Sequence, residues 1–361
     1  VLNNKNIELT WNMTHKYVDK LKNIIFTYCL TSEQDISMRF PFTILILAAA
    51  LLIVPIWFPK AFGADNLMGG LKVYVAPKNL AEKSSWKGQK VTVVRVPNTT
   101  EHLSEFFRWF DHDLKKNKKS VQPVFVDRFP PDFSDIELVS VRKEVFAQIV
   151  LPLILRENNR ILGMRSKVQA LVDKPVLTKQ EEAFLEGMYK RYKIGDVQIE
   201  RAGAAALLSH IDVIPPGLAL AQAAHESGWG RSRFSQKGNA LYGQWTWSED
   251  DPGFVPSQRG EGQTHKVKAF ETLSNSVRSY MLNLNRHSSY APLRKIRTAL
   301  RATASPLKSY ILAEGLIKYS EKRGEYVRHI RTLLRQNNFS KFDRFSLKSH
   351  IDMPEVLPEI L

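Results

Sequence analysis

The sequence has little cysteine: Cys29 is the only one among its 361 residues. A single cysteine cannot form a disulfide within its own chain, and it cannot supply the ligands of cysteine-rich zinc sites or iron–sulfur clusters. Internal repeats and low-complexity tracts are also absent, and 43% of the residues are hydrophobic. This composition excludes a mostly disordered chain and predicts two domains, or one domain with appendages.

One long hydrophobic run stands out, at Pro41–Phe58 (PFTILILAAALLIVPIWF), and it contains no charged residue. It is long enough to span a membrane. With Arg39 before it and the small residues Ala61 and Gly63 after it, the run also fits the core of a signal peptide. Residues 38–64 are therefore interpreted as a cleaved signal peptide or an uncleaved membrane anchor, with a buried core helix as the third interpretation.

Residues 1–37 precede a segment that resembles a complete export signal starting at Met38. We expect these residues to be a non-native or cytoplasmic extension. The rest of the chain is then expected in the periplasm or cell envelope, where the hydrophobic segment could anchor it in the inner membrane.

Acidic residues are fewer than basic ones, 36 against 52, which gives a formal charge of +16. From Asp65 onward the chain holds 46 basic and 32 acidic residues, a difference of +14, so the excess lies in the part expected to be exported. A basic surface favours anionic partners. Outside the cytoplasm these are wall polymers and phospholipid headgroups, and nucleic acid is not expected as a partner.

The sequence from residue 65 onward shows two kinds of pattern. Residues 65–137 predict a small mixed α/β region, with β-rich runs at Leu71–Val75 and Val91–Val96 and an amphipathic helix at Leu103–Leu114. Residues 138–338 are mostly helical in pattern, and residues 339–361 form a C-terminal tail.

Within residues 138–338, apolar residues recur at helical spacing, and Pro152 interrupts the first series. Residues 240–270 hold glycines, prolines and short β-prone runs, which predict a small β-lobe. The fold class is thus mainly α (α+β), with a small β insertion. The predicted helices are Val139–Val172, Lys179–Tyr192, Gly203–Ile211, Gly217–Glu226 and several within 271–336.

The string from Leu218 to Gly230 carries the clearest chemistry. Its alanines predict a closely packed, buried helix, and Glu226 ends that helix. The helix C-terminus carries partial negative charge, so an ionised carboxylate there is repelled. Burial beside Trp229 would disfavour the charged form further. Both effects predict a raised pKa for Glu226, as a general acid needs near neutral pH.

The sequence AAHESGWGRSRF, followed by Gly238–Gly243 (GNALYG), resembles the signature of glycoside hydrolase family 73, the mannosyl-glycoprotein endo-β-N-acetylglucosaminidase-like family. Bax-like bacterial proteins with this domain are the nearest subgroup, over about residues 138–336. The resemblance implies a lysozyme-like helical scaffold for residues 138–338. It also implies hydrolysis of β-1,4 bonds at N-acetylglucosamine in peptidoglycan, whose glycan strands would be the partner, without a cofactor or metal.

The resemblance places Glu226 at the position of the catalytic general acid. The second acid is expected in the β-lobe, where Glu261 is favoured because it lies in a polar, glycine-flanked loop. Other candidates there are Glu249, Asp250, Asp251 and Glu271. Attack by the 2-acetamido group of the substrate would need no second carboxylate.

Tyr280 matches a tyrosine that recurs in the family, and it is expected to orient water or bind an acetamido group, or else to pack in the core. Many members carry a glutamate five residues earlier, where this sequence has Asn275. The residues assigned to substrate binding are Trp229, Asn239, Tyr242, Trp245 and His265, although each aromatic residue could equally belong to the core. A non-catalytic wall-binding scaffold and a membrane-surface adaptor remain as alternative functions.

Overall fold

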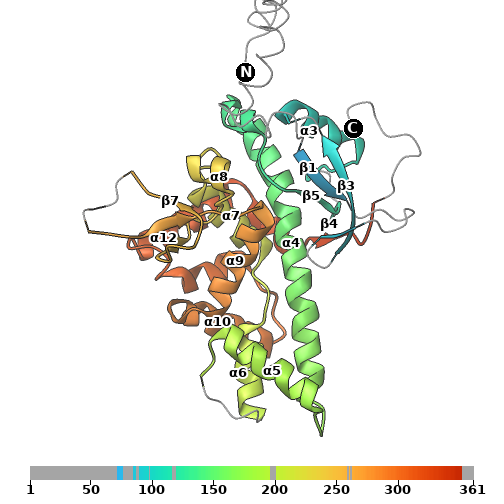
Figure 1. Cartoon of the computed structure of the whole chain (residues 1–361), viewed down its shortest axis with the longest axis vertical. Helices are drawn as coiled ribbons and strands as arrows, with labels where there is room; N and C mark the ends of the chain where they lie inside the picture. Colours follow the sequence, from blue (N-terminus) through green and yellow to red (C-terminus); the bar gives the residue numbers. More distant parts are fainter. Residues whose placement is uncertain are drawn as a thin grey trace, which may run out of the picture. The chain divides into compact units, whose positions relative to one another are not determined.

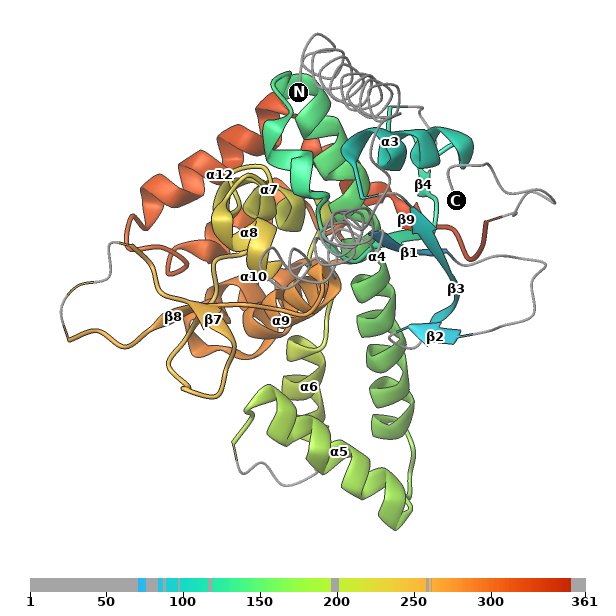
Figure 2. The same cartoon turned by 45° about the horizontal axis from the view of Figure 1, so that its top comes forward.

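The computed structural model describes residues 71–75, 84–86, 89–96, 98–115, 119–195, 201–257, 260 and 262–351 (Figures 1 and 2). The predicted extension 1–37, the export or anchor segment 38–64 and the candidate acid Glu261 all lie outside these residues. From Leu71 onward the chain forms one compact unit. Among the described helices, none combines the length and apolar character needed to cross a membrane.

A four-stranded sheet opens the described part, in the order β2 (Ser84–Trp86), β3 (Gln89–Val96), β1 (Leu71–Val75), β5 (Val124–Val126). Its pairings are antiparallel, with Leu71 opposite Val96 and Val73 opposite Val126. Side chains alternate between the two faces of a strand. Accordingly, alternate residues of β1 beginning with Leu71 are fully buried. The two predicted β-rich runs are confirmed.

The predicted helix at Leu103–Leu114 was misplaced at both ends, because α3 spans Thr100–Trp109. It begins earlier because the Thr99 hydroxyl accepts a hydrogen bond from the His102 amide and caps the helix. It ends earlier because Asp111 takes a left-handed backbone conformation (φ 48°), which a helix cannot continue.

Helix α4 (Val139–Val172) matches the predicted range and contains Pro152 within it. Figures 1 and 2 both show α4 between the sheet on one side and helices α7 (Pro216–Glu226) and α9 (Leu273–Arg286) on the other. Its middle turns, from Val145 to Asn158, are buried on all sides because they contact both groups of elements.

The remaining helices follow the predicted series. Helix α5 has the predicted ends, whereas α6 lies one or two residues earlier than predicted, and the stretch 271–336 is divided into short helices. Their ranges are α5 Lys179–Tyr192, α6 Arg201–His210, α8 Arg233–Gly238, η3 Ser288–Tyr290, α10 Ala291–Ala302, α11 Ser309–Leu312, η4 Ala313–Leu316 and α12 Gly324–Gln336; η2 (Pro131–Asp135) precedes α4.

The β-lobe is a three-stranded antiparallel sheet in the order β6 (Trp245–Thr246), β8 (Lys266–Lys268), β7 (Gly253–Phe254). It lies between α8 and α9 in the chain. The predicted class, mainly α with a small β-lobe, is therefore confirmed.

The end of the described chain returns to its start. Strand β9 (Ser346–Leu347) pairs in parallel with β4 (Ser120–Val121), and η5 (Phe339–Arg344) packs on α7. Residues 339–347 thus form part of the compact unit and cover the helix that carries Glu226.

Candidate active site

Helix α7 is buried from Pro216 to Ala224, and its small side chains allow this. Gly217 lies so close to the Phe339 carbonyl that a Cβ atom would clash. The Gly217 amide donates to Asp343 Oδ1 at 3.1 Å, and the same carboxylate accepts from the Ser309 amide at 2.7 Å. One carboxylate therefore satisfies amides at the beginnings of both α7 and α11.

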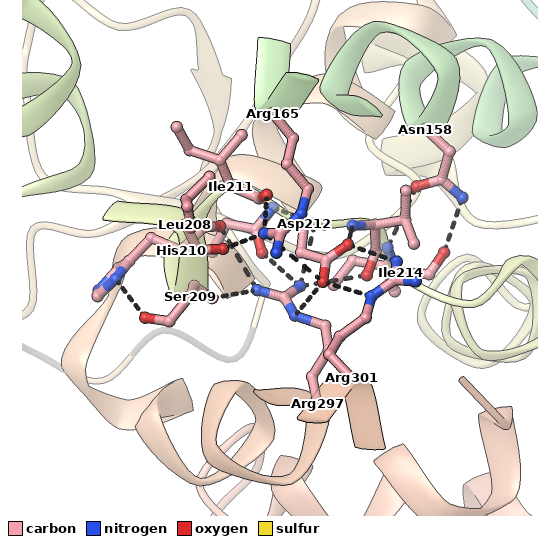
Figure 3. Close-up of polar contacts among 12 residues, drawn as sticks. Asn158, Arg165, Leu208, Ser209, His210, Ile211, Asp212, Ile214, Arg297 and Arg301 are labelled. Atoms are coloured by element: carbon pink, nitrogen blue, oxygen red, sulfur yellow. Dashed lines mark hydrogen bonds and ion pairs between the residues drawn. The ribbon is translucent and has the colours of Figure 1, made fainter. Parts of the chain in front are cut away.

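The segment that leads into α7 is fixed by a polar network around Asp212 (Figure 3). Arg301 binds both Asp212 oxygens, at 3.0 and 2.8 Å, and the fully buried Arg297 donates to the Asp212 and Val213 carbonyls. Asn158 of α4 exchanges two hydrogen bonds with the Ile214 backbone. Helices α4 and α10 thus fix the segment from which α7 starts.

Burial alone would raise the pKa of Asp212. The hydrogen bond from Arg301 and the charges of Arg297, Arg301 and Arg165 outweigh burial, and the pKa lies below its usual value. Asp212 is therefore an ionised, structural carboxylate.

At its other end, α7 leaves through a tight turn. Gly228, Trp229 and Gly230 are all left-handed, with φ of 58°, 58° and 79°. Gly230 must also be glycine because Phe133 and Phe129 fill the space where a Cβ atom would lie. The Ser227 hydroxyl donates to the Ala223 carbonyl and accepts from the Gly230 amide, which closes the turn. The predicted tight exit after Glu226 is present.

Glu226 is partly buried at this exit. Burial raises the pKa of its carboxyl to about 7, against a lowering effect of the hydrogen bond from Tyr326. Tyr326 Oη donates to Oε1 at 2.8 Å. Oε2 faces Gly243, where an added Cβ atom would lie 3.5 Å from it.

A chain of buried hydrogen bonds extends from Glu226 into the core. Tyr326 Oη accepts from Gln222 Nε2 at 2.9 Å, and Gln222 Oε1 accepts from Tyr280 Oη at 2.6 Å. Tyr280 donates to Gln222, Gln222 donates to Tyr326, and Tyr326 donates to Glu226. Every hydrogen bond in the chain therefore points toward the Glu226 carboxyl. Helices α7, α9 and α12 each contribute to it.

Stacked tyrosines enclose this chain. Tyr242 stacks on Tyr280 with ring centroids 3.7 Å apart, and Tyr319 stacks on Tyr326 at 5.2 Å. Tyr319 Oη also donates to the Tyr242 carbonyl at 3.2 Å. Burial raises the pKa of all four phenols, so they stay neutral and act as fixed dipoles. Neutral phenols add no positive charge that would favour the ionised form of Glu226, so burial dominates the pKa of its carboxyl.

The β-lobe presents an aromatic surface. Trp245 is 53% exposed and stacks on the His265 ring at 4.3 Å, and Trp247, 64% exposed, meets the edge of Trp245 at 6.1 Å. Asn239 takes a left-handed conformation and donates to the Phe270 and Glu271 carbonyls, which holds the segment entering the lobe.

The predicted site residues thus fall into separate places. Glu226, Tyr242 and Tyr280 come together, but Tyr242 and Tyr280 are buried and contact solvent hardly at all. Trp229 packs between Phe146 and Phe339, with the Lys143 ammonium over its ring. The proposed contacts of these three with substrate stay predictions.

Among the candidate second acids, Asp251 forms a salt bridge with Lys268 at 2.8 Å and accepts from the Thr246 hydroxyl. Glu249, Asp250 and Glu271 are exposed. The Glu271 carboxylate lies 3.5 Å from the Asn275 amide nitrogen, at the position where family members carry another glutamate.

Tyr326 and Gln222 were missed by the sequence reasoning. Gln222 was detectable, because it lies four residues before Glu226 and is the one polar side chain in the run from Leu218 to Ala224. Tyr326 lies 100 residues away from its partner and had no local signal.

Comparison with known proteins agrees with the motif. Residues 202–339 match the family described as "Glucosaminidase: Mannosyl-glycoprotein endo-beta-N-acetylglucosaminidase". The chain is 28% identical over 213 residues to "Protein bax" of Escherichia coli (strain K12), covering 57% of this chain and 74% of that protein. Among solved structures, the catalytic domain of the autolysin Auto from Listeria monocytogenes is matched at 17% identity and a TM-score of 0.26, over 50% of this chain and 96% of that one.

Proposed function

We propose that the chain is an endo-β-N-acetylglucosaminidase, because residues 202–339 match the glucosaminidase family and the chain is similar to a Bax protein. It hydrolyses β-1,4 glycosidic bonds of peptidoglycan and uses Glu226 as the general acid. The observation that carries the proposal is the partly buried Glu226 carboxyl, whose pKa of about 7 keeps it substantially protonated near neutral pH.

The hydrogen bonds around Glu226 suit this role. Tyr326 donates to Oε1, so the acidic proton resides on Oε2, the oxygen beside Gly243. A glycosidic oxygen placed there would receive the proton as the bond to the anomeric carbon breaks. The carboxylate left behind retains the hydrogen bond from Tyr326, whose hydroxyl is oriented by Gln222.

We assign the aromatic surface of the β-lobe to sugar binding. Trp245 and Trp247 are exposed although they are large and apolar, and His265 supports the Trp245 ring from behind. Pyranose rings present C–H faces that pack on indole rings. The second catalytic group stays open between Glu261 and the 2-acetamido group of the substrate. Asp251 is unsuited because Lys268 and Thr246 already hold it.

The site of action would be the cell envelope, reached through export directed by residues 38–64. The excess of basic residues from Asp65 onward would help hold the enzyme on an anionic wall.

Purified sacculi provide the test. The wild-type chain should release muropeptides, and mass analysis of the products should find N-acetylglucosamine at the new reducing end. Glu226→Gln should release none above background, while Glu186→Gln, which changes an exposed glutamate on α5, should match the wild type. Equal release by Glu226→Gln would refute the assignment of the acid. Binding to sacculi without any product from the wild type would instead support a wall-binding scaffold.

A further inference from the structure

A cavity lies at the opposite end of α7 from Glu226. It has a volume of about 880 Å³ and is formed by four parts of the chain: Lys119, the segment 213–216 before and at the start of α7, and residues from 301–310 and from 340–345. Helix α7 has 11 residues, so at 1.5 Å per residue about 15 Å separate its two ends. The cavity is therefore distinct from the candidate active site.

Basic side chains dominate its polar lining. They are Lys119, Lys308, Lys341, Arg344 and Arg301. Arg301 is neutralised by Asp212, but the other four are exposed, and within the described part of the chain no carboxylate lies within ion-pair distance of them. Four positive charges from three segments thus surround one space.

Asp343 is the acidic group in the lining, and its carboxylate is already occupied. Oδ1 accepts from the Gly217 amide and the Ser309 hydroxyl, and Oδ2 accepts from the Ser309 amide. These bonds fix Asp343 to the ends of two helices, so it cannot turn outward to pair with the four basic residues. Their charges remain available to a ligand.

Apart from Ser340, the rest of the lining is apolar or aromatic: Val213, Pro215, Pro216, Pro306, Leu307, Tyr310 and Phe345. A basic rim over an apolar floor fits an anion that carries a carbon skeleton, rather than a bare inorganic ion. A phosphate monoester or diester has more acceptor oxygens than a carboxylate, so it can take hydrogen bonds from a guanidinium and several ammonium groups at once with oxygens to spare.

We propose that this cavity is a binding site for phosphate esters, such as the glycerol phosphate units of an anionic wall polymer or of a phospholipid headgroup. Occupation of the site would hold the protein on the envelope while the other end of α7 faces the glycan. The proposal does not depend on catalysis, so Glu226→Gln should bind these ligands as the wild type does.

Two probes distinguish the sources of the phosphate: soluble poly(glycerol phosphate), and vesicles of phosphatidylglycerol mixed with phosphatidylcholine, with pure phosphatidylcholine vesicles as the blank. The test variant is Lys308→Glu/Arg344→Glu, since both side chains are exposed and hold no other element in place. The matched control is Lys179→Glu/Lys190→Glu on α5, which changes the net charge equally. Thermal melts should show that both variants fold.

The wild type should bind at least one probe, and the cavity variant should lose affinity by on the order of tenfold or more, while the control loses about twofold or less. The probe that binds identifies the source. Equal losses in both variants would show general surface charge and overturn the proposal. Failure of the wild type to bind either probe would overturn it too, as would equal binding of poly-glutamate.

Discussion

Asp212 and Glu226 are two buried or partly buried carboxylates that flank the same helix, and their surroundings differ in kind. Three arginines surround Asp212 and hold its pKa low, whereas neutral tyrosines surround Glu226 and burial raises its pKa to about 7. The comparison separates two uses of a carboxylate. One is kept charged and holds a segment in place, and the other stays substantially protonated near neutral pH, which suits the proton donor we propose.

The largest effect should come from Glu226→Gln, which removes the proton donor without changing the size of the side chain. We expect the rate of glycan cleavage to fall by about 10²- to 10⁴-fold. In the wild type the rate should also fall as the pH rises past about 7, because the acid is then ionised. A full rate with Glu226→Gln, measured by muropeptide release, would show that Glu226 is not the proton donor.

Asp212→Asn should act on stability instead. It leaves the fully buried Arg297 without its counter-charge, and we expect a loss of about 3–5 kcal/mol in the free energy of unfolding. Denaturant titration at neutral pH measures this. The pH dependence of any remaining activity should be unchanged, and a shifted pH profile would contradict a purely structural role.

The two carboxylates should also give stability opposite dependences on pH. The pKa of Glu226 is higher in the folded chain than the ordinary value of 4.5, so the folded state binds more protons and loses stability as pH rises from about 4.5 to about 7. The pKa of Asp212 is lower in the folded chain than its unfolded value of about 3.8. Its ionised carboxylate therefore stabilises the fold at pH values above 3.8, and this contribution is lost as the pH falls through the folded pKa.

Glu226→Gln should therefore be more stable than the wild type above pH 7, by about 1–3 kcal/mol after allowance for partial exposure of the carboxyl. The difference should vanish near pH 4, where both side chains are neutral. Denaturation curves at both pH values decide this, and a difference that does not change with pH would contradict the raised pKa.

Tyr326→Phe should have the smallest effect of these substitutions, and it tests the hydrogen bond to Glu226 directly. It removes the hydrogen bond that lowers the pKa of Glu226, so that pKa rises and the alkaline limb of the activity profile moves to higher pH. The rate at the optimum should fall roughly tenfold, because the carboxylate formed after proton transfer loses a donor. Tyr319→Phe is the control, since its hydroxyl binds a backbone carbonyl instead of Glu226. Equal pH profiles for both variants would count against the role given to Tyr326.

The sequence predicted the local parts of this site well. The alanine-rich run, the glutamate at its end and the two glycines after it are neighbours in the chain, and the turn they form depends mainly on their own conformational preferences. The helices α4 and α5 were predicted with their ends because apolar spacing is a local signal, and in the structure a capping box between Thr178 and Glu181 fixes the start of α5.

The surroundings of Glu226 could not be predicted in the same way. Tyr326 reaches Glu226 only because α12 packs on α7. Aromatic residues such as Tyr280 and Trp229 look the same in a sequence whether their side chains line a cleft or fill a core. Here both pack against other aromatic rings. The helix end at Trp109 was missed since it depends on one left-handed residue, Asp111.

The packing of η5 on α7 also sets when this helix can be covered during synthesis. The hydroxyl of Ser346 lies 3.5 Å from the Lys119 carbonyl, although 227 residues separate them in the chain, and Phe339 covers the start of α7. Contacts between such distant residues cannot form until the later ones exist. Helix α7 therefore stays uncovered along its η5 side until residues 339–346 have been made.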